Sequence, residues 1–153
     1  MTGVQTCALP ILDWSLLDDP AHQGVQRLVS ALNRLLQSTP ALHDRAADPA
    51  AFEWIEPGDG RTAMLCFQRR DDAASLLIAV CNFADFAQPA YRVGAARPGR
   101  YVECLNTDAA EFGGASLGAG ASHDAVPTSA HARAHSIVLD VPASTTVLLA
   151  WQA

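Results

Sequence analysis

Basic clusters are absent from this sequence. The 153 residues include no block of lysine or arginine longer than the pair Arg69–Arg70, and the formal net charge is −6 at pH 7. Proteins that bind nucleic acid through its phosphates carry a basic patch or stripe, and an acidic chain is repelled by anionic lipid. We therefore expect neither nucleic acid nor a membrane surface as a partner. Half of the residues are hydrophobic and 17% are charged, a composition typical of a globular domain.

Long apolar runs are also missing. No stretch approaches the roughly 20 consecutive apolar residues of a transmembrane helix. Residues 1–11 lack the basic region, the apolar segment and the small-residue cleavage site of a secretory signal peptide, and they have no helix or strand periodicity. We therefore expect a soluble, cytoplasmic protein.

The cysteines form no recognisable framework. Cys7, Cys66, Cys81 and Cys104 include no CxxC pair, and their spacing fits neither a zinc site nor a disulfide-rich domain. Cys66 and Cys81 lie in apolar runs, where a reduced thiol behaves as a small hydrophobic side chain. This pattern favours a reducing compartment.

One amphipathic helix is predicted over residues 20–37. Asp19 is a favourable N-cap, Pro20 suits the first helical position, and Pro40 ends the helix because it restricts the residue before it. The apolar positions recur at the spacing of one helical face: they are Val25, Leu28, Val29, Leu32, Leu35 and Leu36.

After a polar linker, the pattern changes to short strands separated by turn residues. Seven strands are predicted, at residues 51–56, 62–70, 74–83, 90–94, 100–106, 135–141 and 145–151. This sequence pattern is typical of an antiparallel sandwich. Residues 113–134 form a long Gly-, Ala- and Ser-rich loop. The expected buried residues are Leu65, Phe67, Leu77, Ile78, Val80, Val138, Val147 and Leu149.

Candidate catalytic groups have better structural interpretations. The pair Asp18–Asp19 caps the helix, and Asp71–Asp72 lies in a turn, where aspartate is favoured for backbone reasons. There is no GxSxG motif, and the glycine-rich residues 113–120 lack the strand, lysine and helix of a phosphate-binding loop.

Three histidines are the nearest approach to a metal site. His123, His131 and His135 lie close in sequence, but no helix of the HExxH type surrounds them. We interpret them as polar loop histidines. No catalytic, cofactor-binding or metal-binding residue is therefore assigned, and no cofactor is expected.

Aromatic side chains on predicted strands leave two interpretations open. Trp54, Tyr91, Tyr101 and Trp151 could stack on sugar rings if they were exposed. Strand aromatics more often pack in or beside the core, and packing is the preferred interpretation.

Long strings of the sequence resemble the C-terminal end of bacterial glycogen branching enzymes. They include LDWSLLDDPAHQGVQRLVSALNRLLQSTPALH, FEWIEPGDGRTAMLCFQRR, VCNF, YRVGAARPGRYVECLNTDAAEFGG and HARAHSIVLDVPASTTVLL, in family order. The resemblance covers residues 12–149. Residues 1–11, MTGVQTCALPI, instead resemble a translated sequencing adapter.

That resemblance implies an amylase-type (β/α)8 barrel followed by a C-terminal all-β sandwich. Residues 12–42 would then be the end of the barrel with its last helix, 43–51 a linker, and 52–153 the all-β domain. The fold class expected for this chain is mainly β, with one amphipathic helix left from the barrel.

The resemblance also implies a reaction, the transfer of α-1,4-glucan segments to 6-hydroxyls in glycogen biosynthesis. Family enzymes use three carboxylates at the mouth of the barrel, and all would lie upstream of Leu12. We expect this chain alone to be inactive and to have a structural or glucan-positioning role. Its partners would be the missing barrel and, through the parent enzyme, glycogen or amylose. The alternatives are a carbohydrate-binding module or the terminal domain of another amylase-family enzyme.

Two positions depart from the family pattern. Ser15 stands where the family often has histidine, which puts a polar role at that position in doubt. Ala132 stands where the family tends to have glycine. Either a positive φ is not needed there, or alanine adopts one under strain.

Overall fold

The computed structural model describes residues 13–58, 62–115 and 120–153, so the adapter-like residues 1–11 lie outside the described part. Its helical elements are η1 (Trp14–Asp18), α1 (Pro20–Ser38), α2 (Pro40–His43), η2 (Pro49–Ala51) and η3 (Ala110–Phe112). Its strands are β1 (Phe52–Glu56), β2 (Met64–Arg70), β3 (Leu76–Asn82), β4 (Gln88–Ala95), β5 (Arg100–Asn106), β6 (Ser122–Asp124), β7 (His135–Val141) and β8 (Thr145–Gln152).

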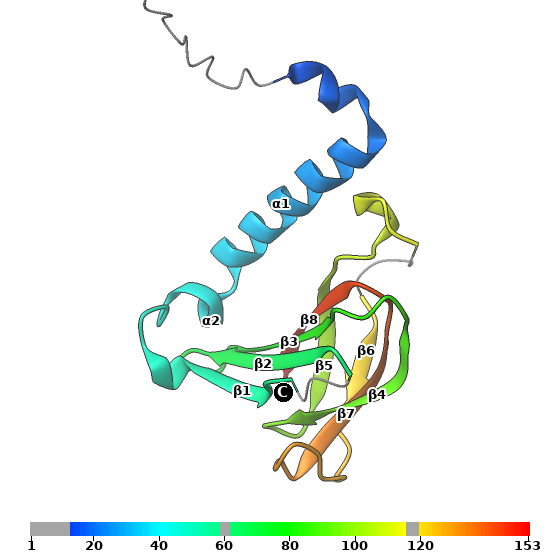
Figure 1. Ribbon diagram of the computed structural model, residues 1–153. Coiled ribbons are helices and arrows are strands. Elements are labelled where there is room, and N and C mark those ends of the chain that lie inside the picture. The colour runs from blue at the N-terminus through cyan, green and yellow to red at the C-terminus, as the bar shows by residue number, and fades with distance from the viewer. Residues whose placement is uncertain (1–12, 59–61, 116–119) are drawn as a thin grey trace, which may run out of the picture.

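The strands form two layers (Figure 1). One sheet has six strands in the order β1-β2-β3-β8-β5-β6, and β4 and β7 form the other. All described strand pairs are antiparallel. The inner faces enclose one core, made of Ile55, Met64, Cys66, Leu76, Ile78, Val80, Val93, Ala95, Tyr101, Ile137, Leu139, Val141, Val147 and Leu149. The predicted mainly-β sandwich is confirmed.

All seven predicted strands form, and an eighth was missed. Strand β6 lies inside the Gly-, Ala- and Ser-rich segment that was expected to be a loop. It pairs with β5, so that Tyr101 lies opposite His123. Its three residues have no apolar alternation of their own. The edge of β5 supplies backbone partners, and this tertiary contact decides the conformation.

The predicted core was right in the central strands, partly right in β2 and wrong at Val138. Five residues are almost fully buried: Leu77, Ile78, Val80, Val147 and Leu149. Leu65 and Phe67 are only half-buried, because the inward face of β2 carries Met64, Cys66 and Gln68. Val138 is exposed, since its neighbours Ile137 and Leu139 are the residues of β7 that point into the core.

The predicted helix is confirmed as α1. The Asp19 carboxylate accepts a hydrogen bond from the Ala21 N–H, and Pro20 begins the helix. Thr39 is the C-cap, and Pro40 begins the short helix α2. No helix in the described part of the chain is long and apolar enough to cross a membrane.

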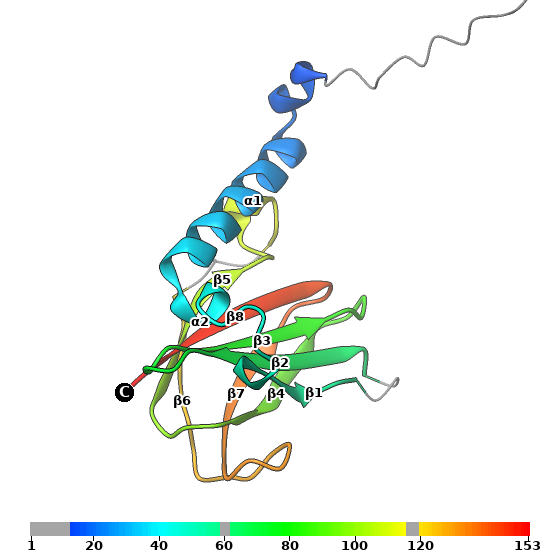
Figure 2. The same cartoon turned by 90° about the vertical axis from the view of Figure 1, so that its left-hand side faces the viewer.

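Helix α1 rises away from the sandwich, whereas α2 lies on the outer face of the six-stranded sheet (Figures 1 and 2). Ala41 of α2 is fully buried. Its backbone N–H donates to the Ser75 hydroxyl at 3.3 Å, and its carbonyl accepts from Arg69 Nε at 3.1 Å. The helical segment is therefore attached to the sheet through α2.

Candidate functional site

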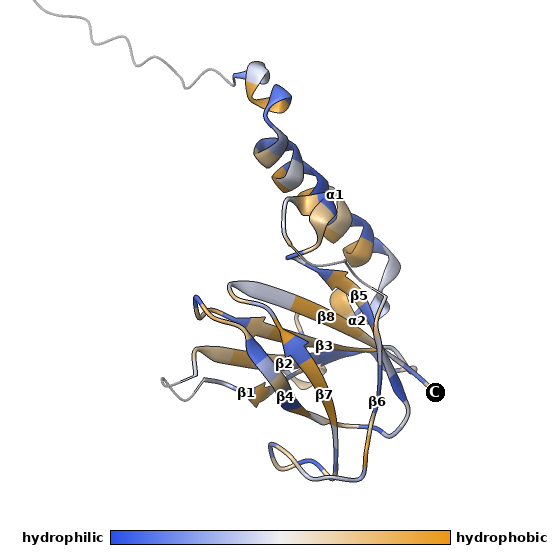
Figure 3. Ribbon diagram, turned by 90° about the vertical axis from the view of Figure 1, so that its right-hand side faces the viewer, coloured by the Kyte–Doolittle hydropathy of each residue, from blue (hydrophilic) through white to orange (hydrophobic). Residues whose placement is uncertain are grey.

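The apolar face of α1 is divided into two adjacent rows. One row is buried or half-buried and consists of Gly24, Leu28, Ala31 and Leu35. The next row is exposed and consists of Val25 (59%), Val29 (51%), Leu32 (39%) and Leu36 (46%). Figure 3 shows hydrophobic and hydrophilic positions alternating along the α1 ribbon. The exposed row is the candidate functional surface, and we call these four residues the α1 stripe.

The buried row is anchored where α1 meets η3. Gly24 is buried, and a Cβ at this position would lie 2.3 Å from the carbonyl oxygen of Phe112. Only glycine allows the two backbones to approach this closely. Sequence reasoning missed this contact. A glycine inside an otherwise regular helical pattern was the available signal, because such a residue often has a packing reason.

The 3-10 helix η1 folds against the beginning of α1. Gln23 Nε2 donates to the carbonyl oxygen of Leu17 at 2.7 Å. The His22 Nδ1 lies 3.3 Å from the carbonyl oxygen of Leu16. These contacts hold the turn between η1 and α1, and they place the apolar residues of η1 next to the start of the α1 stripe.

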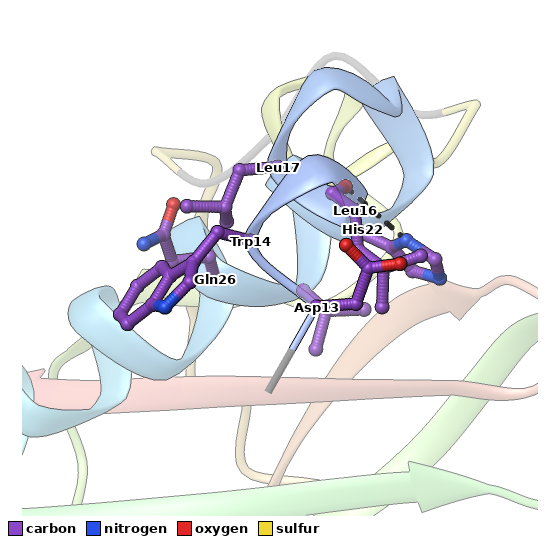
Figure 4. A pocket seen from close by; sticks show the side chains of 7 residues that line it. Asp13, Trp14, Leu16, Leu17, His22 and Gln26 are labelled. Atoms are coloured by element: carbon purple, nitrogen blue, oxygen red, sulfur yellow. Dashed lines mark hydrogen bonds between the residues drawn. The ribbon is translucent and has the colours of Figure 1, made fainter. Parts of the chain in front are cut away.

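A cleft of about 360 Å³ lies at this turn, and its lining residues are Asp13, Trp14, Leu16, Leu17, His22, Val25 and Gln26. In Figure 4, Trp14 and Gln26 lie on one side of the turn, and Asp13 and His22 on the other. Trp14 is 71% exposed. Since Val25 belongs to both, the cleft and the α1 stripe form one continuous apolar surface.

Asp13 is hydrogen-bonded to Ser15, the residue at which this chain departs from the family pattern. Its carboxylate accepts from the Ser15 hydroxyl at 2.7 Å and from the Ser15 N–H at 3.0 Å. The side-chain hydrogen bond from Ser15 is the main reason that the pKa of Asp13 lies below its usual value. Ser15 therefore has a polar role, which is to cap η1 together with Asp13.

One residue of each acidic pair, Asp19 and Asp71, has the cap or turn role predicted for it. Asp19 caps α1. Asp71 accepts hydrogen bonds from backbone N–H groups of its own turn, and Asp72 forms an ion pair with Arg45. Each of these carboxylates is engaged in holding a cap, a turn or a linker contact.

The three histidines are placed separately. His123 lies on β6 and contacts Glu103 at 3.2 Å. His131 lies in the turn before β7, and its Nδ1 accepts from the Gly94 N–H at 3.1 Å. His135 begins β7 and is half-buried. Among the residues that the structure describes, no three His, Cys, Asp or Glu side chains form a group that could hold a metal ion.

The turn before β7 decides between the two interpretations of Ala132. Ala130 and Arg133 exchange two backbone hydrogen bonds of 3.1 and 2.9 Å, which closes a two-residue turn. The central residues His131 and Ala132 have φ values of 47° and 59°. Such a turn favours glycine or asparagine, so Ala132 adopts the positive φ under strain.

The aromatic side chains on the strands mainly pack in or beside the core. Tyr101 is fully buried, and its hydroxyl donates to the Arg97 carbonyl at 3.0 Å. Trp151 is half-buried, with the Arg97 guanidinium 4.8 Å from its ring centroid. Tyr91 is half-buried as well. Trp54 is the one member of this set that is exposed, at 48%, so the four residues do not form an exposed aromatic pair.

Residues 54–152 match the family described as alpha amylase, C-terminal all-beta domain. The chain belongs to this family. The match begins within β1 and ends with β8, so it includes part of β1 and all of the strands from β2 to β8.

Similar sequences are named as branching enzymes. The chain is 46% identical over 136 residues to the 1,4-alpha-glucan branching enzyme GlgB of Burkholderia pseudomallei (strain 668). It is 43% identical over 139 residues to the enzyme of that name from Bordetella pertussis. These alignments cover 89% and 91% of this chain, but the chain spans only 18% and 19% of those relatives.

Among solved structures, the chain superposes on an alpha-amylase from H. orenii with a TM-score of 0.41 and 19% sequence identity. That superposition covers 82% of this chain and 20% of the amylase chain. The family assignment rests on the sequence match over residues 54–152.

Proposed function

We propose that this chain is the C-terminal part of a 1,4-alpha-glucan branching enzyme, which transfers α-1,4-glucan segments to 6-hydroxyls in glycogen biosynthesis. The observation that supports this most is the extent of the similarity to the branching enzymes. Only 100 residues run from Trp54 to Ala153, so an alignment of 136 residues includes most of the segment before Trp54. The similarity therefore extends beyond the all-β family match into α1.

We propose that the catalytic part of such an enzyme packs against the α1 stripe. The exposed row contains four large aliphatic side chains next to Trp14 and Leu16, which are 71% and 46% exposed. A contiguous apolar surface of this kind marks an interaction site. A catalytic barrel preceding this chain would be joined to it at η1, beside the stripe. On this proposal residues 12–42 belong structurally to the barrel, 43–51 link it to the domain, and 52–153 form the all-β domain.

The role proposed for the chain itself is structural, or the positioning of glucan near the catalytic part. The carboxylates of Asp13, Asp19, Asp71 and Asp72 are engaged in caps, a turn and an ion pair. We infer that the chain does not branch or hydrolyse glucan alone. The chain would interact with glycogen or amylose only as part of the parent enzyme. We also propose a cytoplasmic location, supported by the free thiols of Cys66, Cys81 and Cys104, and partners that include neither nucleic acid nor membrane.

Fragment complementation would test this proposal. A Burkholderia pseudomallei branching enzyme lacking the region aligned with this chain would be produced, and the chain would be added or co-expressed. Branching of amylose would be followed by the loss of iodine colour. The chain alone should give none, and the pair should recover activity that the shortened enzyme lacks.

Matched variants locate the contact. Leu32→Glu places a charge in the α1 stripe and should prevent recovery, because an unpaired carboxylate would be buried in the interface. Asn33→Glu changes the neighbouring exposed position and should allow recovery. Equal recovery with both variants would contradict docking through the stripe, and activity of the purified chain alone would contradict the proposed inactivity.

A further inference from the structure

His123 lies at the edge where the two sheets meet. It is the middle residue of β6, the last strand of the six-stranded sheet. Its Nδ1 lies 3.0 Å from the carbonyl oxygen of Val138 in β7. Its Nε2 lies 3.2 Å from Oε1 of Glu103 in β5. One imidazole ring thus connects three strands that belong to two different sheets.

Both atoms that face the ring nitrogens are acceptors. A backbone carbonyl has no proton to donate, and a carboxylate accepts only. A neutral imidazole carries one N–H, so it would turn a lone pair toward either Val138 or Glu103. An imidazolium carries two N–H groups and satisfies both contacts. The side chains are 17% exposed for His123 and 8% for Glu103, so water replaces these contacts poorly.

We propose that His123 is a protonated latch, which holds the edge strand β7 of the small sheet to the six-stranded sheet and releases it when the ring loses its second proton. This goes beyond the proposed branching-enzyme role, because it concerns only contacts inside the sandwich. It does not depend on any partner.

The charges around the ring favour the imidazolium. Glu103 faces it from β5, and Asp140 contributes a negative charge from β7. On β6 itself, Asp124 is paired with Arg100 of β5 at 2.9 Å. The hydrogen bond that the ring donates to Glu103 is the largest cause that raises the pKa of His123 above its ordinary value, while burial opposes it.

The cation on the remaining neighbouring strand is engaged elsewhere. Arg92 of β4 lies opposite Val138 in the small sheet, and its Nη1 donates to the Ser136 hydroxyl at 2.8 Å. The charges that act on the ring are therefore the carboxylates of Glu103 and Asp140. Their sign favours a retained proton on the ring.

The direction of the pH effect follows from linkage. The folded pKa of His123 is raised, so its stabilising contribution is complete below the unfolded value of about 6.5. The contribution is lost as the pH rises through the folded pKa. The edge between β6 and β7 should therefore open more readily in mildly alkaline solution than at pH 6.

The first experiment measures the ring directly in the full chain. Two-bond 1H–15N correlation spectra across pH 5 to 10 report the protonation of each histidine ring nitrogen. His123 should titrate above the ordinary histidine pKa of about 6.5, and both of its ring nitrogens should carry protons below the midpoint of that titration. Titration at or below the ordinary value would overturn the latch.

The second experiment measures the opening. Amide hydrogen exchange of β6 and β7, corrected for the intrinsic effect of pH, should become faster between pH 6 and 9 in the wild-type chain. Glu103→Gln removes the carboxylate, and His123→Gln removes the titrating ring; both should lower or abolish this pH-dependent difference. His43→Gln is the matched control and should retain it.

The variants also separate a latch from a purely structural contact. If His123→Gln fails to fold, Glu103→Gln and the wild-type ring titration still decide the question. The same pH-dependent exchange in wild type and in Glu103→Gln would contradict the proposal.

Discussion

Gly24 of α1 and Phe112 of η3 are in backbone contact: a Cβ on residue 24 would lie 2.3 Å from the Phe112 carbonyl oxygen. The residues are far apart in sequence, and η3 belongs to the segment between β5 and β6. This approach connects the N-terminal half of α1 to the all-β part. The opposite end of α1 is attached through α2, so the helix is held at two points while the α1 stripe stays exposed.

The first prediction concerns this approach. Gly24→Ala should loosen α1 from η3, because the new methyl group meets backbone atoms that cannot rotate away. In a free helix the same change would stabilise by about 1 kcal/mol. Hydrogen exchange in the first half of α1 should therefore become faster instead of slower. Ser30→Ala, at an exposed position of the same helix, is the control. Slower exchange in Gly24→Ala would show that the contact is unimportant.

The second prediction tests the central strand. Val80 is 0% exposed, and Val80→Asp would place an unpaired carboxylate in the core. The expected cost is several kcal/mol, comparable with the whole stability of a small domain, so the chain should lose its cooperative thermal transition. Val25→Asp in the α1 stripe makes the same chemical change at a site that is 59% exposed, and it should keep the transition. An unchanged melting temperature in Val80→Asp would contradict the burial of β3.

The third prediction concerns the strained turn. Ala132 has a φ of 59°, and a positive φ costs a residue with a Cβ about 1–2 kcal/mol relative to glycine. Ala132→Gly should therefore raise the free energy of unfolding by about 1 kcal/mol, measured by urea denaturation. Ala134→Gly, two residues along and also exposed, should lower stability or leave it unchanged, because glycine gains entropy in the unfolded chain. An equal change in the free energy of unfolding for Ala132→Gly and Ala134→Gly would show that Ala132 is not strained.

The fourth prediction separates the helical segment from the domain. A chain that begins at residue 39 keeps α2 and loses η1 and α1, so it should melt cooperatively and be more soluble, since the α1 stripe is gone. A chain that begins at residue 52 also loses the contacts of Ala41 with Ser75 and Arg69, and it should be less stable. Loss of cooperative melting in the longer fragment would mean that α1 belongs to the domain core.

The fifth prediction concerns thiol reactivity. Burial raises the pKa of the Cys66 thiol to about 12, and burial also raises the pKa of Cys81 and of Cys104. Because the thiolate is the reactive form, these three residues should be alkylated slowly at pH 8 in the folded chain. Peptide mapping after iodoacetamide treatment would measure each site, with the chain in guanidinium as the fully reactive control. Rapid native labelling of Cys66 would contradict its buried position.

The sequence alone was enough to predict the helices and strands whose sequence signals are local. The helix α1 follows from a 3.6-residue apolar period, an Asp19 N-cap and a Pro40 stop, and each of these acts within a few residues. The strand β3 follows from an uninterrupted apolar run. The resemblance to branching enzymes likewise needed only strings in their order.

The tertiary structure decided whatever depends on a partner distant in the chain. Strand β6 exists because β5 offers it an edge. The inward face of β2 could not be predicted, because Leu65 and Phe67 are as apolar as the core residues Met64 and Cys66. The role of His123 required Glu103 and Val138 to meet around one ring, and the role of Gly24 required Phe112. Local periodicity sets which backbone forms, whereas only packing across the chain sets which side chain is buried, which donor meets which acceptor, and where two backbones touch.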